Sequence, residues 1–145
     1  MKVQDELEQI LLDEAKIEGK NEQIVRLESS AMRMTAAMDG EIVSRSRSND
    51  QLAKYMERKE KLTKEIAKLQ EQNDSRKDYL SSIIDSLKNP LFIKILYAMY
   101  FAGKSAETIG YDLGYCTRNI YYLRDKALQE AEKIIAESRS IRKFS

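Results

Sequence analysis

The chain has no histidine, no tryptophan and a single cysteine among its 145 residues. A lone cysteine cannot form an internal disulfide, and without histidine the usual zinc-binding spacings cannot be built. As a nucleophile, Cys116 would lack a histidine base, and no glycine-rich phosphate-binding loop is present. We therefore expect no enzymatic activity, no cofactor and no bound metal.

Residues that interrupt helices are also rare, with one proline and five glycines. Glu, Lys, Leu, Ile and Ala are abundant, which predicts an all-α protein. No apolar run reaches the roughly 18 residues needed to cross a bilayer. The acidic first ten residues also lack the apolar core of a signal peptide. These absences predict a cytoplasmic protein with no membrane partner.

Two long segments in the first 88 residues have the periodicity of amphipathic helices. In the first, an apolar residue or alanine recurs at every seventh position, and Gly19 marks a bend or break. In the second, from Gln51 to Leu87, apolar residues recur about every 3.5 residues. Residues 39–50, which are rich in serine, are expected to form a solvated loop. The seven-residue repeat comprises Val3, Ile10, Ile17, Ile24, Ala31 and Met38.

A helix as long as the second segment needs a partner for its apolar stripe. Either the first segment folds back against it as an antiparallel hairpin, or the same helix of another subunit packs there. The matched lengths favour the hairpin. A hairpin with a residual apolar stripe commonly dimerises, so we also expect a homo-oligomer formed through the long helix. Asn73 interrupts the stripe, and a buried asparagine at such a position fixes register or oligomeric state.

A new helical unit is predicted to begin at Asn89. Asparagine is a good helix cap, and Pro90 suits the first helical position. The stretch LFIKILYAMYF that follows is the most apolar in the chain and should form a buried helix that stops at Gly103. Ser105 is then expected to cap the next helix.

The segment from Ser105 to Leu128 has the spacing of a helix-turn-helix, in which two short helices meet across a tight turn. Gly110 leaves room where the two helices cross, and Gly114 can adopt the left-handed conformation that ends a helix. The predicted organisation is a helical hairpin or coiled coil over residues 1–88, a helix-turn-helix bundle over residues 89–137 and a basic tail over residues 138–145.

In a helix-turn-helix, the first residues of the second helix reach base edges, and flanking cations reach phosphates. For the DNA groove we predict Thr117, Arg118, Tyr121 and Tyr122. For the phosphate backbone we predict Lys104, Arg124 and Lys126. Residues 1–88 hold 16 basic and 18 acidic side chains, whereas residues 89–145 hold nine and six. The basic surplus lies with the motif but is small, so a single copy should bind DNA weakly.

The segment from Asn89 to Ile135, in which LGYC precedes an aromatic-rich helix that runs into KAL, resembles the DNA-binding region 4 of sigma-70-type factors. The whole chain is similar to the ArpU/RinA-like late-transcription activators of phages and mobile elements. The resemblance implies a regulator that binds double-stranded DNA sequence-specifically and activates phage or mobile-element genes. This chain has Cys116 where that family often has serine. Because cysteine caps helices poorly, Thr117 is expected to take over the cap and shift the helix start by one residue.

Two other functions fit the same pattern. One is a small DNA-packaging, terminase-like subunit, which a ring-sized oligomer would favour. The other is a coiled-coil adaptor that binds RNA polymerase or another protein, with tyrosines at the core of the interface and with binding that tolerates salt. For Cys116, a small semi-buried residue at the turn is favoured over a redox switch.

Overall fold

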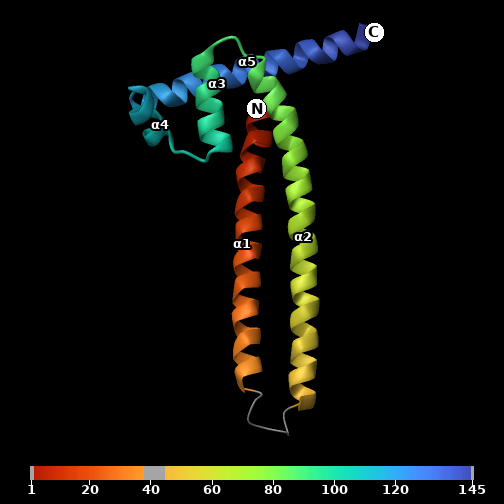
Figure 1. Ribbon diagram of the computed structural model, residues 1–145. Helices are drawn as coiled ribbons and strands as arrows, with labels where there is room; N and C mark the ends of the chain where they lie inside the picture. The colour runs from red at the N-terminus through yellow and green to blue at the C-terminus, as the bar shows by residue number, and fades with distance from the viewer. Residues whose placement is uncertain (1, 38–44, 145) are drawn as a thin grey trace. The chain divides into compact units, whose positions relative to one another are not determined.

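The computed structural model describes residues 2–37 and 45–144, and these ranges contain no strand. The all-α prediction is therefore confirmed for them. Figure 1 shows the order of the elements along the chain. They are α1 (Lys2–Ala37), α2 (Arg45–Asp85), α3 (Pro90–Leu96), the π-helix η3 (Tyr97–Phe101), α4 (Ala106–Leu113) and α5 (Thr117–Phe144).

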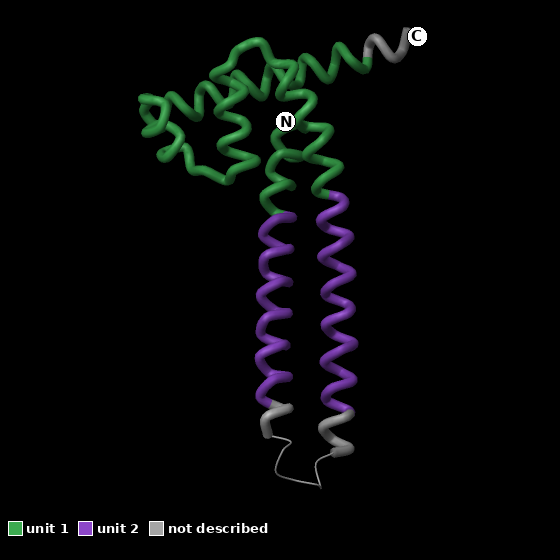
Figure 2. The backbone as a smooth tube through the Cα atoms, viewed as in Figure 1, with its two compact units in different colours: residues 1–12, 73–145 green, residues 13–72 purple. Residues whose placement is uncertain are grey.

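The chain divides into two compact units (Figure 2). Unit 1 holds residues 1–12 together with residues 73–145, and unit 2 holds residues 13–72. The division differs from the boundary at residue 88 that the cap Asn89 suggested. The reason is packing, because the first turns of α1 and the last turns of α2 bury their apolar side chains in the same core as α5.

Unit 2 is an antiparallel pair formed by parts of α1 and α2, as the hairpin prediction requires. Lys20 forms an ion pair with Glu65 at 2.7 Å, and Glu28 forms one with Lys59 at 3.0 Å, so the residue numbers run in opposite directions. Of the bend or break predicted at Gly19, the break was wrong, because α1 continues through this residue.

The segment between the two long helices is shorter than predicted. Residues 45–50, which were expected to belong to the loop, form the first turns of α2. The rest of the predicted loop, residues 39–44, lies outside the described residues.

Unit 1 is built around α5 and two apolar clusters. The larger cluster joins α1, α2, α3, η3 and α5, and its fully buried members include Leu7, Leu80, Leu96 and Leu128. The smaller cluster, formed by Ile95, Ala106, Ile109 and Ile120, lies beneath the pair α4–α5.

The start of α3 agrees with the sequence. Asn89 caps the helix by accepting a hydrogen bond from the backbone N–H of Leu91 at 3.0 Å, and Pro90 is the first helical residue. The predicted helix does not continue unchanged to Gly103, however. It widens at Tyr97 into the π-helix, which ends at Phe101. At the other end of the unit, α5 continues to Phe144, so the predicted tail is helical as far as that residue.

Candidate nucleic-acid interface

The corner between α4 and α5 is fixed by caps that the sequence predicted. The hydroxyl of Ser105 accepts a hydrogen bond from the N–H of Thr108 at 3.2 Å and so caps α4. Gly114 ends the helix in the left-handed conformation, with φ 78° and ψ 31°. The N–H of Tyr115 donates to the carbonyl of Gly110 at 2.8 Å, which closes the turn.

Gly110 allows the turn to pass close to α4. A Cβ atom at this position would lie 2.5 Å from the carbonyl oxygen of Tyr115 and 3.4 Å from Cγ1 of Ile120. The first distance is a clash with backbone, which has little freedom to move. The tight corner therefore requires glycine here, as the sequence indicated, and the contact places the first turns of α5 directly after α4.

The start of α5 corrects one expectation. Cys116, not Thr117, precedes the helix, and its carbonyl accepts a hydrogen bond from the N–H of Ile120 at 3.1 Å. At the start of α4, the carbonyl of the cap residue Ser105 likewise accepts a hydrogen bond from the N–H of Ile109. Thr117 is consequently the first helical residue and does not take over the cap. Cys116 is also exposed, where a semi-buried position was expected.

The first turns of α5 present a continuous outward stripe, which we call the reading stripe: Arg118, Tyr121, Tyr122 and Asp125. All four side chains are exposed. Their three- and four-residue steps put them on one face of the helix. The opposite face carries the fully buried residues Ile120 and Ala127. Thr117 is half-buried at the edge of the stripe.

The three cations expected on the phosphate backbone all have partners within unit 1. Lys104 lies 3.5 Å from a carboxylate oxygen of Asp112. The ammonium group of Lys126 lies 4.7 Å from the ring centre of Tyr122. The contacts of Lys104 and Lys126 are at the surface and are weak.

Arg124 is held more firmly than the two lysines. Its Nε and Nη2 atoms donate to Oδ1 of Asp125 at 3.1 and 2.9 Å, and its guanidinium lies 4.9 Å from the ring centre of Tyr121. Its side chain is only 19% exposed. Burial alone would lower the pKa of Arg124, but the hydrogen bond to Asp125 and the neighbouring Tyr100 raise it overall. Arg124 thus contacts two residues of the reading stripe, Tyr121 and Asp125, while its own side chain is mostly buried.

Two further tyrosines lie beside the corner and were not selected from the sequence. Tyr111 on α4 is 90% exposed, and Tyr115 in the turn is also exposed. With Tyr121 and Tyr122 they make four exposed tyrosines within residues 111–122. The sequence contained a signal for this exposed surface, namely four tyrosines within residues 111–122. A helix in the core would bury such residues.

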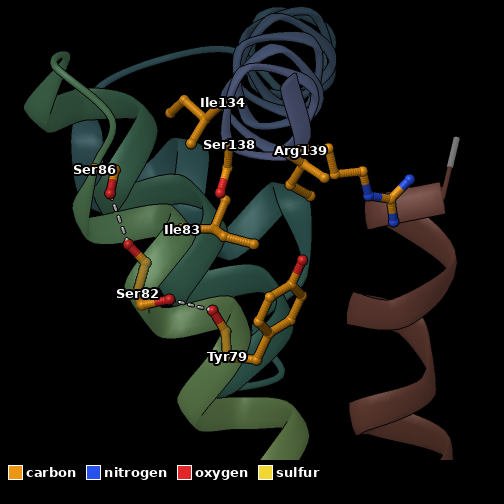
Figure 3. A pocket seen from close by; sticks show the side chains of 8 residues that line it. Tyr79, Ser82, Ile83, Ser86, Ile134, Ser138 and Arg139 are labelled. Carbon is orange, nitrogen blue, oxygen red and sulfur yellow. Dashed lines mark hydrogen bonds between the residues drawn. The ribbon is translucent and has the colours of Figure 1, made fainter. Parts of the chain in front are cut away.

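Unit 1 also contains a groove of about 440 Å³ between the end of α2 and the C-terminal half of α5 (Figure 3). Ile83 and Ile135 line this groove and are almost completely buried. The hydroxyl of Ser82 donates to the carbonyl of Tyr79 at 2.6 Å, and that of Ser86 donates to the carbonyl of Ser82 at 2.8 Å. The two serine donors are therefore occupied by backbone carbonyls of their own segment.

No protein-family model, no curated protein and no solved structure matches this chain. Among the described residues, none of the helices is both long enough and apolar enough to span a membrane. The same residues contain no group of three or more acidic or cysteine side chains placed to hold a metal ion.

Proposed function

We propose that the protein is a sequence-specific double-stranded DNA-binding regulator of transcription and that α5 is its reading helix. The observation that carries this proposal is the reading stripe on the first turns of α5. It follows a corner held tight by Gly110. A cation and two tyrosines point outward there, where a merely solvated helix usually carries glutamate and lysine.

The dimensions and chemistry of this surface suit a major groove. A helix with its side chains is about 10–12 Å across, and the groove is about 12 Å wide. Arg118 is exposed and has no ion-pair partner in the described part of the chain. It is therefore free to pair with the O6 and N7 atoms of guanine, a contact worth about 1–3 kcal/mol of discrimination. The hydroxyls of Tyr121 and Tyr122 can donate to phosphates.

A second copy would strengthen the weak electrostatic binding expected of one chain. Among the described side chains of unit 2, the only buried apolar residues are Leu62 and Ile66. The rest of its apolar seam is half-buried, which leaves surface for a further helix pair to cover. We infer pairing of two chains through unit 2, and a DNA site with two half-sites. The half-buried seam residues are Ile17, Ile24, Leu27, Leu52, Tyr55 and Leu69.

The resemblance to late-transcription activators supports gene control, specifically activation of phage or mobile-element genes. Localisation in the cytoplasm belongs to the same proposal. One observation favours a second candidate, an adaptor that docks RNA polymerase or another protein. The four exposed tyrosines around the corner are residues that protein interfaces favour.

The test is a salt titration of the full-length chain on duplexes selected by that chain from a randomised DNA library. Its matched variant is the double substitution Arg118→Ala, Tyr122→Ala. We expect the chain to enrich one sequence, to lose affinity steeply with salt and to lose selectivity in the variant. Enrichment of no sequence at low salt, or equal binding by the variant, would contradict the proposal and favour the adaptor.

Two single substitutions distinguish contacts with DNA bases from contacts with the phosphate backbone. Arg118→Ala should relax the sequence preference, whereas Lys104→Ala should weaken all duplexes alike. Because Lys104 is paired with Asp112, we expect its effect to be modest. Sedimentation equilibrium of the chain decides the number of copies, and a ring-sized oligomer would favour the packaging subunit.

A further inference from the structure

The reading stripe contains a carboxylate, which a DNA-binding surface would normally exclude. Asp125 is 55% exposed and lies one turn beyond Tyr121 and Tyr122. A negative charge facing the phosphate backbone is repelled unless a cation compensates it. The position of Asp125 on this face therefore needs an explanation beyond solubility.

Arg124 provides that compensation from beneath the surface. Its two donors both go to Oδ1 of Asp125, at 3.1 and 2.9 Å. The guanidinium is fixed against the ring of Tyr121 and interacts electrostatically with the buried Tyr100. The net charge of the pair is therefore close to zero. Both donors of Arg124 go to Oδ1, so Oδ2 of this exposed side chain is left as an acceptor.

An outward acceptor on a reading helix selects a base with a donor in the major groove. Cytosine presents its N4 amino group there, and aspartate accepts from it. We propose that Asp125 is a specificity-determining residue that accepts a hydrogen bond from the N4 amino group of a cytosine, with Arg124 as its positioning residue. This inference rests on the proposed function and assigns one base class to one position of the site.

The spacing along α5 also predicts where the cytosine lies. Asp125 follows Arg118 by seven residues, which is about 10.5 Å along the helix axis. At a rise of 3.4 Å per base pair along the duplex axis, this corresponds to at most about three base pairs from the pair that Arg118 reads, because a helix in the groove is inclined to that axis.

The experiment compares the sequences enriched from a randomised duplex library by the full-length chain and by the variants Asp125→Asn and Asp125→Ala. The chain should favour cytosine at one position by roughly 5- to 150-fold, the range that corresponds to one good base contact. Asp125→Asn should change that preference to adenine, because asparagine pairs with N6 and N7 of adenine. Asp125→Ala should leave the position without a preference.

Two further variants make the comparison specific. Glu130→Gln removes an exposed carboxylate from the same helix but away from the reading stripe, and we expect it to enrich the same sequence as the unmodified chain. Arg124→Lys keeps the charge but cannot donate two hydrogen bonds from a planar guanidinium to Oδ1 of Asp125. It should weaken the cytosine preference and leave the guanine position unchanged. Circular dichroism of each variant identifies any loss of folding.

The outcomes separate the two proposals. If the unmodified chain enriches no sequence, the proposed function fails and this inference fails with it. If the unmodified chain enriches a sequence that Asp125→Asn leaves unchanged, Asp125 is only a solvated acid. In that case the inference is overturned while the proposed function stands.

Discussion

At the scale of single residues, the helix boundaries of unit 1 depend on side chains that cap a helix and on glycines that allow a tight turn. Asn89, Ser105, Gly110 and Gly114 all have the roles that the sequence indicated. These roles were predictable because a cap or a turn is decided within a few residues of chain. The pairing of Arg124 with Asp125 above Tyr100 was not predictable, since it depends on a segment more than 20 residues away.

Gly110→Ala is expected to destabilise unit 1. Its Cβ atom would lie 2.5 Å from the carbonyl oxygen of Tyr115, and such overpacking costs about 1–3 kcal/mol. Urea unfolding of the variant measures the change in the free energy of unfolding.

Gly19→Ala is the matched control for Gly110→Ala. Gly19 is also helical, but nothing lies within 4 Å of a Cβ atom placed there. Alanine should therefore stabilise the helix by roughly 0.5–1 kcal/mol. Equal effects of the two substitutions would contradict the role assigned to the close approach at Gly110.

At the scale of elements, the π-helix η3, which contacts α2 through Tyr97, differs most from the sequence-based expectation of one continuous helix. The N–H of Ala102 donates to the carbonyl of Tyr97 at 2.9 Å, which is the five-residue step of a π-helix. Tyr97 is held against α2, because its hydroxyl donates to Oδ1 of Asp85 at 2.6 Å and contacts Ser81 at the same distance. The sequence LFIKILYAMYF, in which Lys94 is the only charged residue, contains no local signal for this wider turn. The partners of the Tyr97 hydroxyl, Asp85 and Ser81, lie on a different helix.

Tyr97→Phe should lower the free energy of unfolding by about 1 kcal/mol at neutral pH, because it removes these hydrogen bonds. Burial, and then the hydrogen bond to Asp85, raise the pKa of Tyr97 above its ordinary value. The native state thus holds this proton more tightly than the unfolded chain, whose tyrosine pKa is about 10. The resulting stabilisation is complete below about pH 10 and is lost as the pH rises through the native pKa.

Urea unfolding at neutral and alkaline pH tests both parts of this prediction. The alkaline loss of stability should be smaller in the phenylalanine variant. It should not vanish, because burial also raises the pKa of Tyr100. Tyr111→Phe, at an exposed position on α4, is the control and should behave like the unmodified chain. An identical alkaline decline in the Tyr97 variant would contradict the assignment.

At the scale of the whole molecule, the sequence predicted the helices better than the units they form. The seven-residue repeat in α1 and the apolar stripe in α2 report which face of each helix is buried. They do not report which other element covers that face. The sequence therefore placed the first turns of α1 at one end of a hairpin. The structure instead buries Val3, Leu7 and Ile10 in the core of unit 1 together with residues of α5.

Leu7→Ala is expected to destabilise unit 1 although Leu7 lies about 110 residues before the start of α5. Leu7 is completely buried in the core that includes α5, and its truncation should cost about 2–5 kcal/mol. Leu12→Ala, at a position that is 54% exposed, should change stability by less than about 0.5 kcal/mol. The comparison uses urea unfolding, and similar losses in the two variants would mean that the first turns of α1 do not support α5.

The contact between Val3 and Glu132 has a consequence for the order in which the protein matures. The N–H of Val3 donates to a carboxylate oxygen of Glu132 at 2.7 Å, across 129 residues of chain. Helical proteins usually fold quickly because their contacts are local, and a growing chain usually folds from its N-terminal end. Here the first turns of α1 leave the ribosome long before α5 exists to cover them. The first turns of α1 therefore become buried only after α5 has been synthesised, and a chain that ended before α5 would leave Val3, Leu7 and Ile10 without that cover.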